Sequence, residues 1–423
     1  MIRTYIVPCD LKRIHADSIN LNSGRIYSGI VSRHWRLLKQ KGLWLSEKTL
    51  TKLSDMRLAN KEIEMHAHTI DAAQQGFFKA CKTTRALRKA GFPEANFPWR
   101  SKKFRTTTWK NTGVKFKGSR LELSTGAGNA KILVKLPESL WSMLRFLEVR
   151  LVFDKKARKY VWHVVAENGY EAKEASGTNT VSVDLGEIHP AVVGDEVEST
   201  IIACRARRHQ AQGHAKRLAK LAATISRKKK GSRRYSKLVR AKSRMKAHHR
   251  AVVRDMEHKI SRAIVDVAVE RKANTIAMGD IRDIGDEVNL GKQSNQKISG
   301  WNHGQIQKLV EYKAEAEGIK LVMVDEHYTS KTCPQCQHRH KPRGRNFKCP
   351  VCKFQSHRDV VGQINILSVF KTGTPGNIPA PSVVKHRIPY NIRVMRRRLD
   401  TGQIDPVGQS VARAVVAREA AGF

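Results

Sequence analysis

The sequence predicts a protein of mixed α/β class with two or three domains, and three observations support this. Short apolar segments of strand character alternate with long segments of helical periodicity. Two closely spaced pairs of cysteines interrupt the second half of the chain, where they indicate a small metal-bound element. The chain of 423 residues, 40% of them apolar, is long enough to bury cores of ordinary size.

The charge of the chain indicates a polyanionic partner. Lys and Arg number 80 against 37 Asp and Glu, which gives a formal net charge of +43. A protein with this excess repels itself unless a polyanion neutralises it, and nucleic acid offers enough phosphates to do so. An anionic membrane is the alternative, but no apolar run approaches the roughly 20 residues that span a bilayer. The N-terminal apolar stretch is also too short for a signal peptide. We therefore expect a cytoplasmic protein, nucleoid-associated when bound to DNA.

The first 170 residues are expected to form a small β-barrel that carries a helical lobe. Strands are predicted at residues 5–7, 131–137, 146–153 and 159–167. Helical periodicity begins near residue 26 and ends at GFPEANFPWRSKKFR (91–105), which contains two prolines and four basic residues. We therefore assign residues 1–25 and 101–170 to the barrel and 26–100 to the helical lobe.

The second half of the chain begins after a linker at residues 171–179. Buried strands are predicted at TVSVDLG (180–186), NTIAMGD (274–280) and IKLVMVDE (319–326). Between the first two of these, residues 205–254 contain 19 Lys and Arg and no Asp or Glu. Their apolar residues keep helical spacing on both sides of a turn at Gly231 and Ser232. We expect two long basic helices that contact nucleic acid, because such a block is costly unless phosphates lie against it.

The two cysteine pairs predict a structural zinc site. Cys333 and Cys336 form one C-x2-C knuckle, and Cys349 and Cys352 form a second after an interval of twelve residues. Each knuckle can hold one face of a tetrahedral ion, and four thiolates close its coordination sphere. Three nearby histidines are surplus to such a site, and we interpret them as surface or nucleic-acid-facing residues: His338, His340 and His357.

Acidic residues at the ends of predicted elements form a second candidate site. Asp184 ends the strand SVDLG, and Asp359 begins the helix HRDVVGQINIL. In an RNase H-like architecture, acids from a central strand, a neighbouring strand and a late helix hold two Mg2+ ions about 3.5–4 Å apart at the scissile phosphate. Either acid alone is more often a cap. Together, with the zinc knuckles immediately before Asp359, they indicate a nuclease site.

The order of these motifs resembles the TnpB family, the transposon-encoded ancestor of the type V CRISPR effectors. The resemblance rests on the D-L-G strand, the basic helices, VDEHYTSKTCPQC (324–336), the second knuckle and HRDVVGQINIL (357–367). GFPEANFPWRSKKF is similar to the family's FPRFK-type segment. The resemblance covers about 50–370 and is strongest over 180–368.

The resemblance implies a wedge-like β-barrel with a helical recognition lobe, followed by a RuvC nuclease domain. It places the RuvC domain at 180–326 and 354–370 and a zinc ribbon at 327–353. Residues 371–423 have weak periodicity and are expected to form a flexible basic tail. The resemblance also implies Mg2+-dependent cleavage, a guide RNA (omega RNA or CRISPR RNA), and double-stranded target DNA that carries a short adjacent motif.

One position departs from the family pattern. The strand after the basic helices usually ends in a catalytic Glu, and here Gly279 stands in its place. Asp280 is one substitute, although strand alternation directs it to the opposite face unless the strand ends or bulges there. Glu326 is the second, because it ends the next parallel strand and glycine leaves room for its longer side chain. Otherwise Glu326 is a surface acid before a turn, and the site is inactive.

The sequence thus predicts an RNA-guided DNA endonuclease in which Asp184, Glu326 and Asp359 hold Mg2+. A nuclease-inactive, RNA-guided repressor and a compact type V CRISPR effector are the alternatives. A transposase that acts without RNA is disfavoured, because neither DDE-type spacing nor a relaxase motif is evident.

Overall fold

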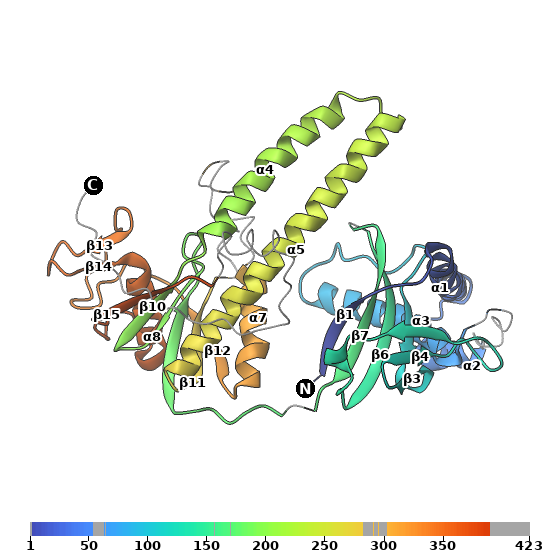
Figure 1. Ribbon diagram of the computed structural model, residues 1–423, viewed down its shortest axis with the longest axis horizontal. Coiled ribbons are helices and arrows are strands. Elements are labelled where there is room, and N and C mark those ends of the chain that lie inside the picture. Colours follow the sequence, from blue (N-terminus) through green and yellow to red (C-terminus); the bar gives the residue numbers. More distant parts are fainter. Residues whose placement is uncertain are drawn as a thin grey trace. The chain divides into compact units, whose positions relative to one another are not determined.

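The structure is a computed structural model that divides the chain into two compact units, Met1–Glu171 and Ala172–Phe423 (Figure 1). It describes residues 2–53, 63, 65–155, 157–169, 171–281, 291, 295 and 303–389. Among the described helices, none is long and apolar enough to cross a membrane.

Unit 1 combines antiparallel strands with three helices. Its elements are β1 (Ile2–Pro8), α1 (Arg13–Lys41), α2 (Glu47–Leu53), α3 (Ala67–Lys89), β2 (Thr107–Lys110), β3 (Val114–Lys117), β4 (Arg120–Leu123), β5 (Ile132–Lys135), β6 (Arg145–Asp154) and β7 (Lys159–Glu167). The strands form a four-stranded sheet in the order β1-β7-β6-β2 and a three-stranded sheet in the order β3-β4-β5. We expected a barrel, but no ladder between the described strands closes the two sheets into one.

The two sheets of unit 1 share a core because their strands alternate in polarity. Every second side chain of β7 is buried, among them Trp162 and Val164. Trp109 of β2 packs against Trp162 with ring centroids 5.9 Å apart. Leu121 and Val134, from the smaller sheet, complete this core. Both sheets therefore bury one face against the other, as a barrel does, without a continuous ladder.

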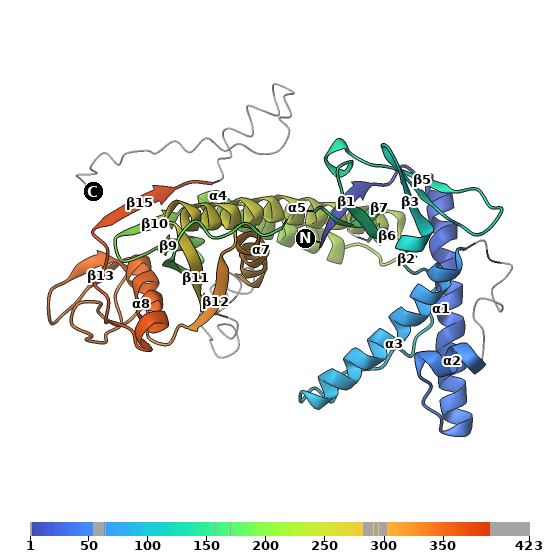
Figure 2. The same ribbon diagram turned by 90° about the horizontal axis from the view of Figure 1, so that it is seen from below.

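The helical lobe of unit 1 begins earlier than the sequence predicted. Helix α1 starts at Arg13, whereas residues 1–25 were assigned to the barrel. The buried positions in its first turns include Ala16, Asn20 and Ser23, which are small or polar, so hydrophobic periodicity does not reveal them. Asn20 joins the helix to the sheet, since its side chain donates to the Leu151 carbonyl and accepts from the Thr107 N–H. Figure 2 shows α1 and α3 extending from the sheets of unit 1 as one lobe.

Unit 2 is built on a six-stranded mixed sheet. Its elements are β8 (Asn179–Asp184), β9 (Ala191–Gly194), β10 (Glu198–Ile202), α4 (Arg205–Ser226), α5 (Arg233–Glu270), β11 (Ala273–Asp280), α7 (His303–Ala316), β12 (Lys320–Asp325), β13 (Asn346–Lys348), β14 (Gln355–His357), α8 (Arg358–Thr372) and β15 (Val383–Arg387). The strand order is β12-β11-β8-β9-β10-β15. Strand β9 pairs in antiparallel orientation with both β8 and β10. Strand β11 pairs in parallel with β8, and β12 pairs in parallel with β11.

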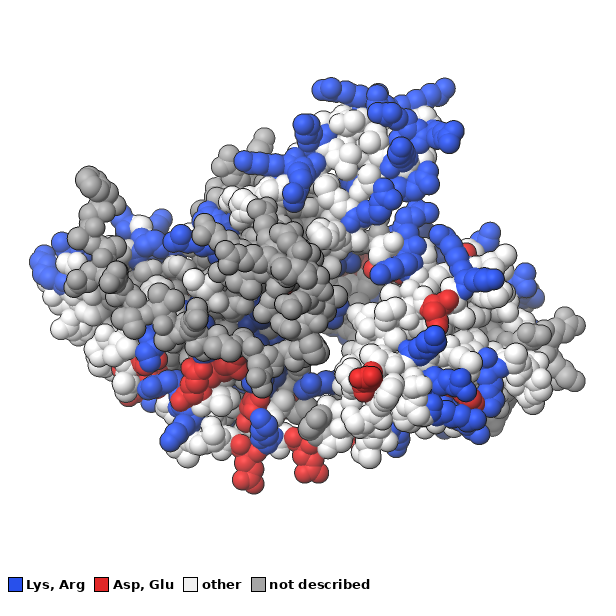
Figure 3. Space-filling view, in the orientation of Figure 1, with Lys and Arg blue, Asp and Glu red and all other residues white. Residues whose placement is uncertain are grey.

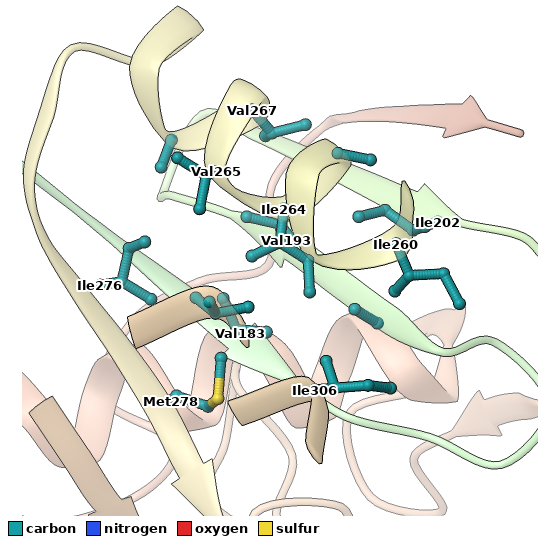
Figure 4. Packing of buried hydrophobic residues seen from close by; sticks show 14 of the residues in the cluster. Val183, Val193, Ile202, Ile260, Ile264, Val265, Val267, Ile276, Met278 and Ile306 are labelled. Carbon is teal, nitrogen blue, oxygen red and sulfur yellow. The ribbon is translucent and has the colours of Figure 1, made fainter. Parts of the chain in front are cut away.

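Helices cover both faces of this sheet. Figure 4 shows Ile260 and Ile264 of α5 above strand residues Val183, Val193 and Ile276. The opposite face packs against α8 through clusters that include strand and helix residues: Val192, Ile201 and Val360 in one, and Ala277, Val324 and Ile366 in another. The inner strands β8, β9 and β11 are largely buried, and the short apolar runs within them made them recognisable in the sequence.

Part of the expected tail is a strand of this sheet. Residues 371–423 were predicted to be flexible, but Val383–Arg387 form β15, which pairs in parallel with β10. All but the last of its residues are exposed, so the segment lacks the apolar signal of a buried strand. Its edge position explains the error, since the ladder to β10 supplies main-chain hydrogen bonds that side-chain patterns do not report. Residues 390–423 lie outside the described part of the chain.

Candidate active site and metal centres

Asp184 lies at the end of the central strand, on the face that α8 covers. Val183 points into the core beneath α5, so alternation directs Ser182 and Asp184 to the other face. Ser182 Oγ donates to the main-chain oxygen of Gln363 in α8 at 2.7 Å. A Cβ added to Gly362 of α8 would lie 2.5 Å from Asp184 Oδ2. Glycine at this position therefore makes room for the carboxylate.

Glu326 occupies the place where the neighbouring strand lacks a side chain. The β8–β11 register pairs Val183 with Met278, which sets Gly279 beside Asp184. A Cβ added to Gly279 would overlap Glu326 Oε1. The carboxylate of Glu326 thus fills the space next to Asp184 that a side chain at position 279 would otherwise take.

Alternation explains why Glu326, rather than Asp280, reaches this space. Ala277 and Val324 both pack on Ile366 of α8, so the side chains two positions further along their strands also face α8. Asp280 follows Gly279 and falls on the opposite face. No bulge interrupts the β11–β12 pairing here, because the register continues through Asp280.

Asp359, the third predicted acid, begins α8 and is held by basic groups. His357 caps the helix, and its Nδ1 accepts from the Asp359 main-chain N–H at 3.2 Å. Asp359 Oδ2 accepts from Arg345 Nη1 at 2.8 Å and lies 2.9 Å from His189 Nδ1. His189 follows β8 and Arg345 precedes β13, so two distant segments orient this carboxylate.

The charges of the three acids influence one another. Burial raises the pKa of Asp184 well above its ordinary value, and the charges of Glu326 and Asp359 raise it further. Burial also raises the pKa of Glu326 to about 7, with added repulsion from Asp280 and Asp325. Glu326 Oε1 is buried and has no hydrogen-bond partner among the described residues. An unpartnered oxygen among repelling carboxylates is the donor set that a hard divalent cation prefers.

The four cysteines predicted to bind zinc lie together. Cys333 Sγ is 3.6 Å from Cys352 Sγ, and Cys336 Sγ is 3.5 Å from Cys349 Sγ. A tetrahedral zinc ion with Zn–S bonds of about 2.3 Å requires sulfur separations close to these. No histidine belongs to this cluster in the described part of the chain.

Three site residues were missed or misplaced by sequence reasoning. The sequence predicts His357 as a surface or nucleic-acid-facing residue; the structure shows that it is half-buried and caps α8. His189 and Arg345 were not singled out, although both contact Asp359. The only local signal was proximity, since His189 follows Asp184 by five residues and His357 precedes Asp359 by two. Neither interval alone indicates a shared site.

Two surfaces carry concentrated positive charge. Helices α4 and α5 form a long hairpin in unit 2, and Figure 3 shows Lys and Arg side chains over its projecting end without a visible Asp or Glu. Unit 1 contains a cavity of about 870 Å3, whose lining includes Lys79, Lys102, Arg105 and Arg150. Arg105 lies over the Tyr27 ring at 4.6 Å, and burial lowers its pKa. Both surfaces suit an anionic polymer.

The overlap between positions 279 and 326 predicts a stability effect. Gly279→Ala should destabilise the protein by about 1–3 kcal/mol, because the new methyl group displaces the Glu326 side chain in a packed site. Urea unfolding at pH 5, where Glu326 is protonated, measures this. Adding Glu326→Ala should recover most of the loss. Gly213→Ala is the control, since an added Cβ there meets nothing within 4 Å in α4, and it should stabilise by about 0.5–1 kcal/mol. Equal stability of Gly279→Ala and wild type would contradict the overlap.

The raised pKa of Glu326 predicts a pH-dependent effect in metal-free protein. The folded state binds this proton more tightly than the unfolded state. Protonation of Glu326 therefore stabilises the fold fully below pH ~4.5, and this stabilisation is lost as the pH rises through about 7. Glutamine resembles the protonated acid at every pH. The free energy of unfolding of Glu326→Gln, measured in urea with EDTA, should therefore exceed that of wild type by about 1–3 kcal/mol at pH 8 and by little at pH 4.5. Glu315→Gln, on the exposed face of α7, is the control and should be neutral at both pH values. A gain that does not depend on pH would refute the assigned pKa.

Two segments of the chain match known protein families. The family described as a probable transposase matches residues 163–285, and the Cas12f1-like TNB domain family matches residues 303–366. A TnpB-like protein of Methanocaldococcus jannaschii is 31% identical over 155 residues, which cover 36% of this chain and 55% of that protein. A putative RNA-guided DNA endonuclease of Escherichia coli K12 is 28% identical over 169 residues, covering 37% and 42%. The chain therefore spans about half the length of these relatives.

A solved structure resembles more of the chain. The cryo-EM structure of a Cas12f1–sgRNA–target DNA complex has a TM-score of 0.60 and covers 84% of this chain and 83% of that one. The sequences are 14% identical over this match, so the likeness concerns the fold. Both units of the chain must contribute to it, because neither is long enough alone.

Proposed function

We propose that the chain is a member of the TnpB family, because it is similar to TnpB-like proteins, and that it is an RNA-guided DNA endonuclease. Its partners are a guide RNA and double-stranded target DNA. The observation that carries the proposal is that Glu326 fills the space over Gly279, beside Asp184, and that the charges of Glu326 and Asp359 both raise the pKa of Asp184. The three acids come from two strand ends and the start of a helix. These elements are far apart in the sequence, so only the fold brings the acids to the same region.

The strand order supports an RNase H-like (RuvC) fold for unit 2. Three antiparallel strands are followed by two parallel strands on the other side of β8, with helices on both faces. The segment with the cysteines is inserted between β12 and α8, as expected of a zinc ribbon at 327–353. Unit 1 supplies the wedge domain, and α1–α3 supply its recognition lobe.

Mg2+ fits the acidic site on the chemistry of its donors. Asp184, Glu326 and Asp359 would hold the ions through carboxylate oxygens, and Glu326 Oε1 has no competing partner among the described residues. When bound, the ions supply an activated water and stabilise the leaving oxygen of the phosphate. Glu326 is the ligand that replaces the usual glutamate at position 279, because its side chain occupies that place.

The surrounding basic residues orient the acids and the substrate. His189 and Arg345 hold the Asp359 carboxylate in a fixed direction before any ion binds. Arg345 also brings a positive charge to a site that must accept a phosphodiester. This charge favours binding of the nucleic-acid backbone. Release of Asp359 from Arg345 would free the guanidinium for a phosphate oxygen.

Zinc fits the four-cysteine cluster. Cys333, Cys336, Cys349 and Cys352 would hold it with all four positions filled, so its contribution is to stability and not to chemistry. The cluster packs on Val361 of α8. Zinc would thereby fix the start of the helix that carries Asp359.

The basic surfaces hold nucleic acid by its backbone, and base pairing with the guide supplies the sequence specificity. Sequencing the RNA that co-purifies with the protein tests this part. A defined structured RNA with a variable 3′ end supports the proposal, whereas a random cellular mixture contradicts it. The ribonucleoprotein is then incubated with Mg2+ and a matching plasmid. Cleavage next to a short motif is expected, and binding without nicking would indicate a repressor instead.

A further inference from the structure

An aromatic pair in the helical lobe of unit 1 has an exposed face. Trp99 stacks on Trp35 with ring centroids 3.7 Å apart and an angle of 21° between the planes. Trp99 is nevertheless 56% exposed. One face of the indole therefore rests on Trp35, and much of the remainder is open to solvent. The open face of the indole offers a flat π-surface on which another ring can stack.

The exposed ring is held rigidly. Trp35 Nε1 donates to the Pro98 carbonyl at 3.2 Å, next to Trp99 in the chain. Trp35 also packs edge-on against Trp44 at 5.5 Å between ring centroids. Further along the same segment, Ser28 Oγ of α1 accepts from the Lys102 N–H at 3.0 Å. The segment is thus tied to α1 on both sides of Trp99, and a ligand would meet a preformed surface.

Cations surround the same aromatic cluster. The Arg85 guanidinium lies 4.1 Å from the centroid of Trp44, and that of Arg88 lies 4.8 Å from the centroid of Phe97. Neither arginine forms an ion pair with a carboxylate among the described residues. Residues 79–105 carry nine Lys and Arg and a single acid, Glu94. A rigid aromatic face among unpaired cations matches a base flanked by phosphates better than an apolar protein surface.

We infer that Trp99 is a stacking platform for a nucleobase of a bound nucleic acid, and that the basic residues of segment 79–105 attract its phosphates. The base is either unpaired or part of the terminal pair of a duplex, since both present one free π-face. This inference rests on the nucleic-acid binding of the proposed function and not on cleavage. The stacking contact would require a base but would not depend on which base it is.

The test compares oligonucleotides with and without bases. Labelled dT20, and a 20-nucleotide strand of abasic residues with the same charge, are bound to full-length protein in EDTA and about 0.3 M salt, which weakens purely electrostatic contacts. If the stacked base is unpaired, Trp99→Ala should weaken dT20 binding by about 5- to 100-fold, as expected for the loss of one stacked base. Binding of the abasic strand should not change. Trp99→Phe should retain most of the affinity for dT20.

A blunt RNA–DNA duplex of 20 base pairs, and the same duplex closed by loops at both ends, identify the source of the base. A loss confined to dT20 assigns an unpaired base, and a loss confined to the blunt duplex assigns a helix end. Either result supports the platform. Trp141→Ala is the matched control, because Trp141 is also exposed, at 43%, in unit 1. It should leave every affinity unchanged.

A direct readout accompanies the affinities. Ultraviolet irradiation of a 20-mer that contains 5-iodouracil, followed by peptide mapping, should place the crosslink at Trp99. Equal weakening of dT20 and the abasic strand, or no loss of affinity for either dT20 or the blunt duplex in Trp99→Ala, would overturn the inference and leave the proposed function intact. Failure of wild-type protein to bind any of the nucleic acids would overturn both.

Discussion

Replacing Glu326 with Gln is expected to reduce target-DNA cleavage by about 10³-fold or more, since loss of a metal-binding carboxylate removes several kcal/mol of transition-state stabilisation. The amide has nearly the same shape but no charge, so packing over Gly279 is preserved. Binding of guide RNA and target DNA should remain within about twofold of wild type, because these contacts lie on the basic surfaces. Cleavage is measured as single-turnover rates at saturating ribonucleoprotein.

Two further variants make this result specific. Asp280→Asn removes an acid of the same neighbourhood on the opposite face of the strand, and it should cleave at close to the wild-type rate. The exchange Gly279→Glu with Glu326→Ala returns the carboxylate to the usual strand position and should restore part of the lost activity. Full activity of Glu326→Gln, or loss of activity in Asp280→Asn, would assign the third acid to another residue.

Loss of zinc is expected to unfold the cysteine segment and abolish cleavage. Structural zinc contributes about 10–16 kcal/mol in small zinc domains, far more than the few apolar residues around it. Cys349 and Phe347 share their small core with Val361 of α8. The same segment contains Arg345, which binds Asp359. Unfolding would therefore release both the helix start and its orienting partner.

The measurement uses Cys349→Ser in full-length protein. Zinc content, determined by elemental analysis, should fall from one ion per chain to near zero, and single-turnover cleavage should be lost. Cys9→Ser is the control, because Cys9 lies in unit 1 and outside the cluster. It should keep both zinc and activity. A Cys349→Ser protein that retains one zinc ion and cleaves normally would show that the cluster is not a zinc site.

The sequence by itself determined the class of the fold and the similarity to TnpB-like proteins. Buried strands such as those ending at Asp184 and Asp280 contain short runs rich in apolar residues, and the cysteine knuckles have a diagnostic spacing. The mixed α/β class is confirmed by the structure, and the similarity to TnpB-like proteins is confirmed by the comparisons. These features are local, so they can be recognised before the chain is folded. The roles of Asp184, Glu326 and Asp359 as metal ligands stay predictions.

Only the tertiary structure decided which side chains meet. The edge strand Val383–Arg387 carries no apolar pattern, because its position is fixed by main-chain pairing with β10. The side chain of Glu326 lies over Gly279 through the register of two strands that are separated by about 40 residues. His189 and Arg345 reach Asp359 from two separate segments that both precede it in the sequence. Such contacts depend on how distant elements pack, and periodicity or spacing along a single segment contains no information about that.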